Sequence, residues 1–86
     1  MISTNHKGEK TIKLDLHELS YKRAKRLVRN VIVFNQGSYN LRIIHGYNRG
    51  TNLKEMIFDE YRHDRRILRV KPGDNLGVTI LVLREL

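Results

Sequence analysis

The 86-residue sequence contains no cysteine and no tryptophan, and it has a single proline. Without cysteine there is neither a disulfide framework nor thiolate chemistry, which fits a reducing compartment. No apolar run approaches the length of a membrane span, and the N-terminus lacks the apolar core of a signal peptide. These absences exclude a disulfide-stabilised scaffold and a cysteine enzyme. They predict a cytoplasmic protein without a membrane partner.

Acidic residues are also few, because nine Asp and Glu stand against seventeen Lys and Arg, giving a net charge of +8. Such a surplus is compatible with a merely solvated surface. The cations are clustered, however, and a clustered basic surface favours a polyanion such as nucleic acid. The two clusters are Lys22, Arg23, Lys25, Arg26 and Arg29, and Arg62, Arg65, Arg66, Arg69 and Lys71.

A chain of this length is one domain. Residues 1–10 are polar and without periodicity, which predicts a flexible N-terminal arm, and residues 11–86 form the folded domain. Strict alternation predicts a strand over residues 11–16, and branched apolar residues predict another over 41–45. Apolar residues at helical spacing predict one helix from an N-cap at Ser20 to about Gly37, and another that begins at Thr51. Two further strands are expected over 67–70 and 78–83, joined by a Pro-Gly turn.

The predicted element order is β-α-β-α-β-β, an α+β fold with two helices on a four-stranded mixed sheet. A right-handed crossover makes the first two strands parallel. The short turn at residues 71–75 makes the last two antiparallel. The segment 78–83 is the most apolar of the chain and is therefore placed in the interior of the sheet.

Chemically capable residues follow the first two strands. Asp15 and His17 close the first strand, and His45 closes the second. Since the carboxyl ends of parallel strands meet at one edge, these three side chains are predicted to lie together, as candidate catalytic residues. Both helices begin at that edge, and helix N-termini attract phosphate.

The residues around this edge are predicted to bind nucleic acid. Cations in the first turns of a helix oppose its dipole at a cost of about 0.3–1 kcal/mol each, and such violations of local rules often mark function. The glycines of the turn after the second strand let the backbone approach an anion closely. The predicted binding residues are Lys22, Arg23, Arg26, Gly46, Tyr47, Asn48, Arg49, Gly50 and Thr51. A divalent metal is compatible with phosphodiester chemistry, but no ligand set supports one, so no cofactor is predicted.

The sequence resembles the small MutS-related (Smr) domain family. Leu14-Asp15-Leu16-His17 is similar to the L-D-x-H motif of that family, and His45-Gly46 with Gly50-Thr51 is similar to its H-G-x-G loop. The resemblance covers about residues 11–84. It implies the fold of the C-terminal domain of translation initiation factor three, with strand order 1-2-4-3. It also implies nucleic-acid binding and, as in several members, endonuclease activity, in some on messenger RNA at stalled ribosomes and in others on DNA during repair or recombination.

Three positions depart from the family pattern. Glu18 stands where glycine is usual after the first motif. Tyr47 and Asn48 replace a usual lysine and glycine in the loop, where Arg49 can restore the charge. These departures bear on substrate contacts more than on the fold.

Three hypotheses follow. The first is an endonuclease acting on RNA, with DNA as the alternative substrate. His17 serves as acid or base, Asp15 orients it, and His45 is the second acid/base group or a phosphate ligand. The second is a non-catalytic module that binds nucleic acid or the ribosome. The third is a protein-interaction domain whose charge only confers solubility. No long exposed apolar patch is evident in the sequence, which predicts a monomer.

Overall fold

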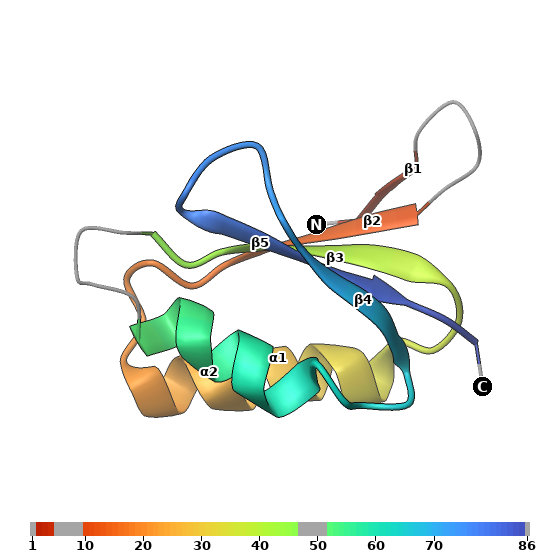
Figure 1. The fold of residues 1–86 in the computed structure, drawn as a ribbon, viewed down its shortest axis with the longest axis horizontal. Coiled ribbons are helices and arrows are strands. Elements are labelled where there is room, and N and C mark those ends of the chain that lie inside the picture. The colour runs from red at the N-terminus through yellow and green to blue at the C-terminus, as the bar shows by residue number, and fades with distance from the viewer. Residues whose placement is uncertain (1, 5–9, 47–51, 86) are drawn as a thin grey trace.

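The computed structural model describes residues 2–4, 10–46 and 52–85. The strands are β1 (Ile2–Thr4), β2 (Lys10–Asp15), β3 (Tyr39–Ile44), β4 (Ile67–Pro72) and β5 (Val78–Leu83), and the helices are α1 (Tyr21–Phe34) and α2 (Asn52–Tyr61). The sheet order is β1-β2-β3-β5-β4. Both helices lie on the same face of this sheet, so the molecule has two layers (Figure 1).

The predicted α+β fold is confirmed. Strands β2, β3, β5 and β4 reproduce the predicted order 1-2-4-3, with β2 and β3 parallel and β5 antiparallel to both of its neighbours. The apolar segment 78–83 is an interior strand, as its composition predicts. Its face towards the helices is buried, and its other residues, Ile80 and Val82, are half buried between neighbouring strands.

The prediction of a flexible arm over residues 1–10 is wrong for Ile2–Thr4. These residues form β1, which pairs antiparallel with the start of β2, and Ile2 lies opposite Ile12. Without β1 the first half of β2 would be an edge of the sheet with unpaired backbone groups. A segment of three residues is too short to show a period of two, so the sequence pattern does not reveal it.

Helix α1 begins where its cap predicts. The Ser20 hydroxyl accepts a hydrogen bond from the Arg23 backbone N–H at 3.3 Å. Buried Ala24, Val28 and Ile32 recur every fourth residue on the side that packs against the sheet. The chain reverses at Gly37, whose φ of +106° favours glycine.

The core lies between the helices and the sheet. Leu16, Leu41, Ile43, Ile57 and Leu81 are fully buried there. Leu16 belongs to the segment after β2, and its N–H donates to the carbonyl of Ile44 at 2.7 Å. The core therefore fixes the chain immediately before His17 against the end of β3, which positions the candidate site.

Candidate functional site

The predicted meeting of the two strand ends is found in the structure. Because β2 and β3 are parallel, with Asp15 opposite Ile44, both chains leave the sheet at one edge. Helix α1 starts at that edge after β2, and α2 starts there after β3. A cleft of about 150 Å³ lies between them, lined by His17, Leu19, Ser20, Tyr21, His45, Asn52 and Leu53.

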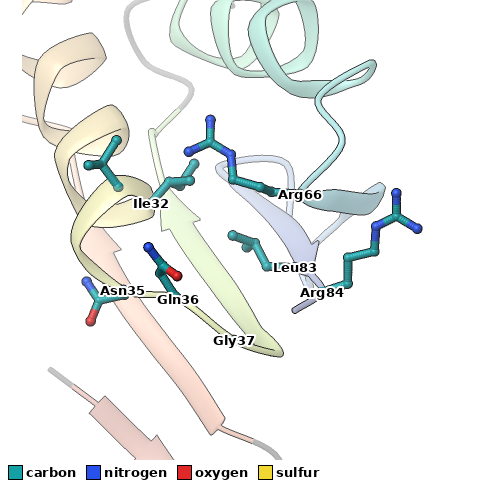
Figure 2. Close-up of a pocket in the computed structure, with 8 residues that line it drawn as sticks. Ile32, Asn35, Gln36, Gly37, Arg66, Leu83 and Arg84 are labelled. Atoms are coloured by element: carbon teal, nitrogen blue, oxygen red, sulfur yellow. The ribbon is translucent and has the colours of Figure 1, made fainter. Parts of the chain in front are cut away.

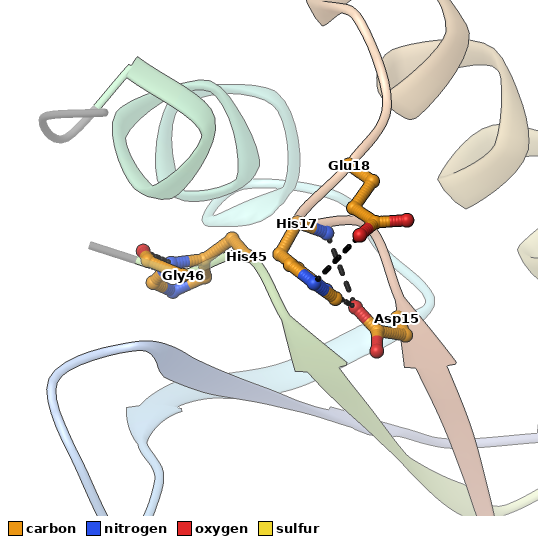
Figure 3. A network of polar contacts seen from close by, with 5 residues as sticks. All are labelled: Asp15, His17, Glu18, His45 and Gly46. Atoms are coloured by element: carbon orange, nitrogen blue, oxygen red, sulfur yellow. Dashed lines mark hydrogen bonds and ion pairs between the residues drawn. The ribbon is translucent and has the colours of Figure 1, made fainter. Parts of the chain in front are cut away.

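Asp15 and His17 form a hydrogen-bonded pair (Figure 3). The imidazole Nδ1 contacts Asp15 Oδ1, and the same oxygen accepts the backbone N–H of His17 at 3.1 Å. The side-chain bond and then the backbone bond hold the pKa of Asp15 below its usual value. An ionised carboxylate only accepts, so Nδ1 is the nitrogen that donates to Asp15. Both side chains are half exposed, which leaves the pair accessible from solvent.

A second carboxylate lies beside the other nitrogen of the imidazole. Glu18 Oε1 is 3.6 Å from His17 Nε2 (Figure 3), and the Glu18 side chain is largely exposed. Glu18 therefore adds a negative charge on the Nε2 side of His17.

His45 is held inside the protein. It is 6% exposed, and both ring nitrogens have protein partners. Nδ1 lies 2.8 Å from the Gly46 carbonyl oxygen and Nε2 lies 2.8 Å from the Thr79 hydroxyl. A carbonyl only accepts, so Nδ1 donates to Gly46, and Nε2 pairs with the Thr79 hydroxyl. The expectation that His45 is a second acid/base group or a phosphate ligand does not fit this geometry, because no ring nitrogen faces the cleft unpaired.

Gly46 connects the two strand ends. Its φ is +75°, and a Cβ placed on it would lie 3.3 Å from the Cβ of His17. The carbonyl of Gly77 accepts the N–H of His45 at 2.9 Å and that of Gly46 at 3.1 Å. The turn after β3 is therefore pinned by the β4–β5 connection and packs closely against His17. The predicted binding residues Tyr47, Asn48, Arg49, Gly50 and Thr51 lie outside the described residues.

The first turn of α1 contains no acidic residue, as the sequence indicates, and Lys22, Arg23 and Arg26 are exposed. Lys25, which the sequence groups with them, has a structural role. Its Nζ lies 2.9 Å from Glu60 Oε1, so it links α1 to α2, and this hydrogen bond raises its pKa. Lys22 and Arg23 follow directly after Ser20 and Tyr21, which line the cleft, whereas Lys25 is paired with Glu60.

Thr79 is a site residue that the sequence analysis does not identify. It is buried, although it carries a hydroxyl. The one feature of the sequence that could have identified it is its position in the alternation of β5. In the alternating strand β5, Thr79 shares a face with Leu81 and Leu83, both of which belong to the core. A hydroxyl on that face needs a partner, and the partner is His45.

A larger hollow of about 200 Å³ lies at the other end of α1, between that helix and β5 (Figure 2). Its two arginines are engaged: Arg66 pairs with Asp64, and Arg84 donates to the Arg65 carbonyl at 2.7 Å. No histidine or carboxylate lines it. The largest hollow, of about 510 Å³, lies between α2 and the strands β4 and β5, and its lining includes Glu55 and Asp59. Of these three hollows, the cleft at the strand ends is the one whose described lining contains histidine.

Within residues 2–4, 10–46 and 52–85 no three His, Asp or Glu side chains group in a way that would hold a metal ion. Of the helices formed by these residues, neither is long and apolar enough to cross a membrane.

Comparison of the chain with protein-family models, with curated proteins and with solved structures gives no match.

Proposed function

We propose that the chain is a cytoplasmic nucleic-acid-binding domain that cleaves phosphodiester bonds as an endonuclease, with RNA as the favoured substrate. The observation that carries this proposal is the exposed Asp15–His17 pair at the edge where both helices begin. An imidazole oriented by a carboxylate is a common general base, and helix N-termini favour the phosphate that it would act upon. The net charge of +8 supplies affinity for a polyanion.

The pair can act on RNA without a further nucleophile. His17 Nε2 takes the proton of a ribose 2′-OH, and the 2′-oxygen attacks the adjacent phosphorus. The 5′-oxygen of the next nucleotide leaves and receives a proton from the imidazolium or from water. The products are a 2′,3′-cyclic phosphate and a 5′-hydroxyl end. Asp15 stabilises the imidazolium that forms during the step and keeps its ring oriented.

His45 has a positioning role in this proposal. It bonds the Gly46 carbonyl and the Thr79 hydroxyl, and so fixes the turn that packs against His17. Lys22 and Arg23 in the first turn of α1 are the described cations that would balance the charge developing on the phosphate. Arg49 and the loop that contains it complete this proposal, on the basis of the Smr resemblance.

The second candidate is a non-catalytic module that binds nucleic acid or the ribosome. Two observations favour it. Of the two described histidines that line the cleft, His45 is buried and only His17 is exposed, and Glu18 adds a negative charge beside the His17 Nε2. Binding would use the same cations, so binding alone does not separate the two candidates. The resemblance to Smr domains is compatible with both candidate functions. Membership of this chain in that family is itself part of the proposal.

Product analysis tests the proposal. Labelled RNA and DNA of one sequence are incubated with the purified protein in EDTA, and separately with Mg²⁺ or Mn²⁺. We expect RNA cleavage in EDTA with 2′,3′-cyclic phosphate ends, and resistance at a nucleotide that lacks its 2′-OH. Salt-dependent binding with no cut product under any condition would favour the binding module. Binding that does not depend on salt would contradict the polyanion assignment itself.

A further inference from the structure

One face of the sheet is not covered by either helix (Figure 1). The strand registers show which side chains it carries. Lys13, Arg42, Ile80 and Lys71 lie side by side across four strands, and Thr11, Asn40, Val82 and Arg69 form the next row. The intervening row, Ile12, Leu41, Leu81 and Val70, packs in the core, which places the first two rows on the opposite face.

The side chains on this face are more apolar than those of an ordinary solvated sheet face. The uncovered side of a sheet is usually polar. Here Ile44, Ile80 and Val82 are only half buried. Ile80 lies between Arg42 and Lys71, and Arg69 lies beside Val82. Lys13, Arg69 and Lys71 are exposed, and Arg42 reaches across to Asp74 at 2.7 Å. An aliphatic strip between cations matches a ligand that is itself part apolar and part anionic.

The same face runs into the candidate active site. Residues two apart on a strand point to the same side, so Lys13 and Asp15 share this face. Lys13 also interacts electrostatically with Asp15, since it is among the charges that lower the pKa of Asp15. A polyanion that lies on the row of Lys13 and Arg42 therefore continues towards the Asp15–His17 pair without crossing the helix layer.

We propose that the uncovered sheet face, with Lys13, Arg42, Arg69 and Lys71, is a binding track for a single strand of nucleic acid. Phosphates contact the cations, and unpaired bases lay their apolar faces on Ile80 and Val82. Neighbouring strands are about 4.8 Å apart, so the row presents cations at intervals that a flexible backbone can follow. The occupant is single-stranded because paired bases would not expose their faces. This inference rests on the proposed function for the nature of the ligand, but it assigns the ligand to a different surface from α1.

Variants that remove positive charges from different surfaces test where the RNA binds. Fluorescence anisotropy with a labelled single-stranded RNA of about twelve nucleotides is measured over a range of salt concentrations. The starting protein carries His17→Ala, so that no cleavage intervenes. Three double variants each remove two positive charges: Lys13→Gln/Lys71→Gln on the sheet face, Arg26→Gln/Arg29→Gln on α1, and Arg62→Gln/Arg65→Gln beyond the end of α2.

We expect the sheet variant to lose about tenfold in affinity, and its salt slope to fall by about 1.4, which corresponds to two phosphate contacts on a single strand. The Arg62/Arg65 variant should stay within about twofold of the starting protein, since these side chains lie at the far end of α2. Val82→Thr keeps the shape of the side chain, and it should weaken binding without a change in salt slope. Equal losses for the sheet and Arg62/Arg65 variants, or a loss confined to the α1 variant, would overturn the track.

The results distinguish a failure of the binding track from a failure of the proposed endonuclease activity. If wild-type protein cleaves RNA while the sheet variant binds like the Arg62/Arg65 variant, the track is wrong and the endonuclease stands. If the sheet variant loses binding but the wild type never cleaves, the track stands and the endonuclease does not. Competition by polyglutamate as strong as that by RNA at equal charge would overturn nucleic acid as the occupant and point to an acidic peptide.

Discussion

Gly46 packs against His17 so closely that a methyl group on Gly46 would lie 3.3 Å from the His17 Cβ. This contact joins the ends of two strands that are separated by a whole helix in the sequence. It means that a side chain at position 46 would press on His17. The proposed site is therefore sensitive to changes that do not touch the pair itself.

Gly46→Ala should impair the site as well as the fold. The φ of +75° costs a non-glycine residue about 1–2 kcal/mol, and the added methyl group displaces His17. We expect a loss of that size in the free energy of unfolding and a loss of cleavage of at least tenfold. Unfolding by urea, followed by circular dichroism because the chain has no tryptophan, measures the first quantity.

Gly37→Ala is the matched control for this change. Gly37 also has a positive φ, of +106°, but a Cβ there would meet no atom within 4 Å. It should destabilise the protein by a similar amount and leave the cleavage rate of the folded protein unchanged. Similar losses of cleavage in both variants would show that the contact with His17 has no functional effect.

Thr79→Val tests the positioning role of His45. The change keeps the shape of the side chain but removes the hydroxyl that bonds His45 Nε2, leaving a buried ring nitrogen unpaired at a cost of about 1–3 kcal/mol. We expect lower stability and slower cleavage. Thr79→Ser retains the hydroxyl, so it should recover most of the cleavage despite the missing methyl group. If the valine and serine variants cleave equally, the hydrogen bond does not contribute.

Much of the fold is predictable from the sequence because local patterns determine it. Three of these patterns depend only on residues close together in the sequence: the alternation before His17, the Ser20 cap and the apolar segment 78–83. The state of His45 is not predictable in this way. Its burial depends on Thr79, which is 34 residues later and becomes a neighbour only through the pairing of β3 with β5.

The ion pairs illustrate the same limit. Lys25 has no acidic partner within α1, because its partner Glu60 belongs to α2. In contrast, Asp15 and His17 are two residues apart on one strand end, and their contact is predictable from spacing. Interactions within one element are therefore visible in the sequence, whereas those between elements require the packed structure.

Glu18→Gln should strengthen binding. The Glu18 carboxylate lies 3.6 Å from His17 Nε2 and repels an approaching phosphate. The side chain is 84% exposed, so solvent screens the effect, and we expect a gain in RNA affinity of only about two- to threefold at low salt. The gain should vanish at high salt. Affinity that falls in this variant would mean that Glu18 contacts the ligand favourably.

Asp64 should contribute to stability in a manner that depends on pH. Hydrogen bonds from Arg66 lower the pKa of Asp64 below its ordinary value of 3.8. Its contribution is therefore present above about pH 4 and is lost as the pH falls through the lower pKa of the folded state. Asp64→Asn should cost about 1 kcal/mol at neutral pH, a modest value because Arg66 is 37% exposed.

The difference in unfolding free energy between wild type and Asp64→Asn should accordingly shrink towards zero in strong acid. Urea unfolding at a series of pH values measures it. A difference that stays constant down to about pH 2 would contradict the ion-pair assignment.

We propose that the Asp15–His17 pair catalyses RNA cleavage and does not only bind RNA. Single-turnover cleavage of a labelled RNA by wild type, Asp15→Asn and His17→Ala tests it most directly, with Kd measured for each protein. His63→Ala, which removes an exposed histidine beyond the end of α2, is the control. We predict that His17→Ala cleaves about 10²–10⁴-fold more slowly and Asp15→Asn at least tenfold more slowly, with Kd changed less than about threefold and His63→Ala unaffected. Cleavage at the wild-type rate by both site variants would contradict the account.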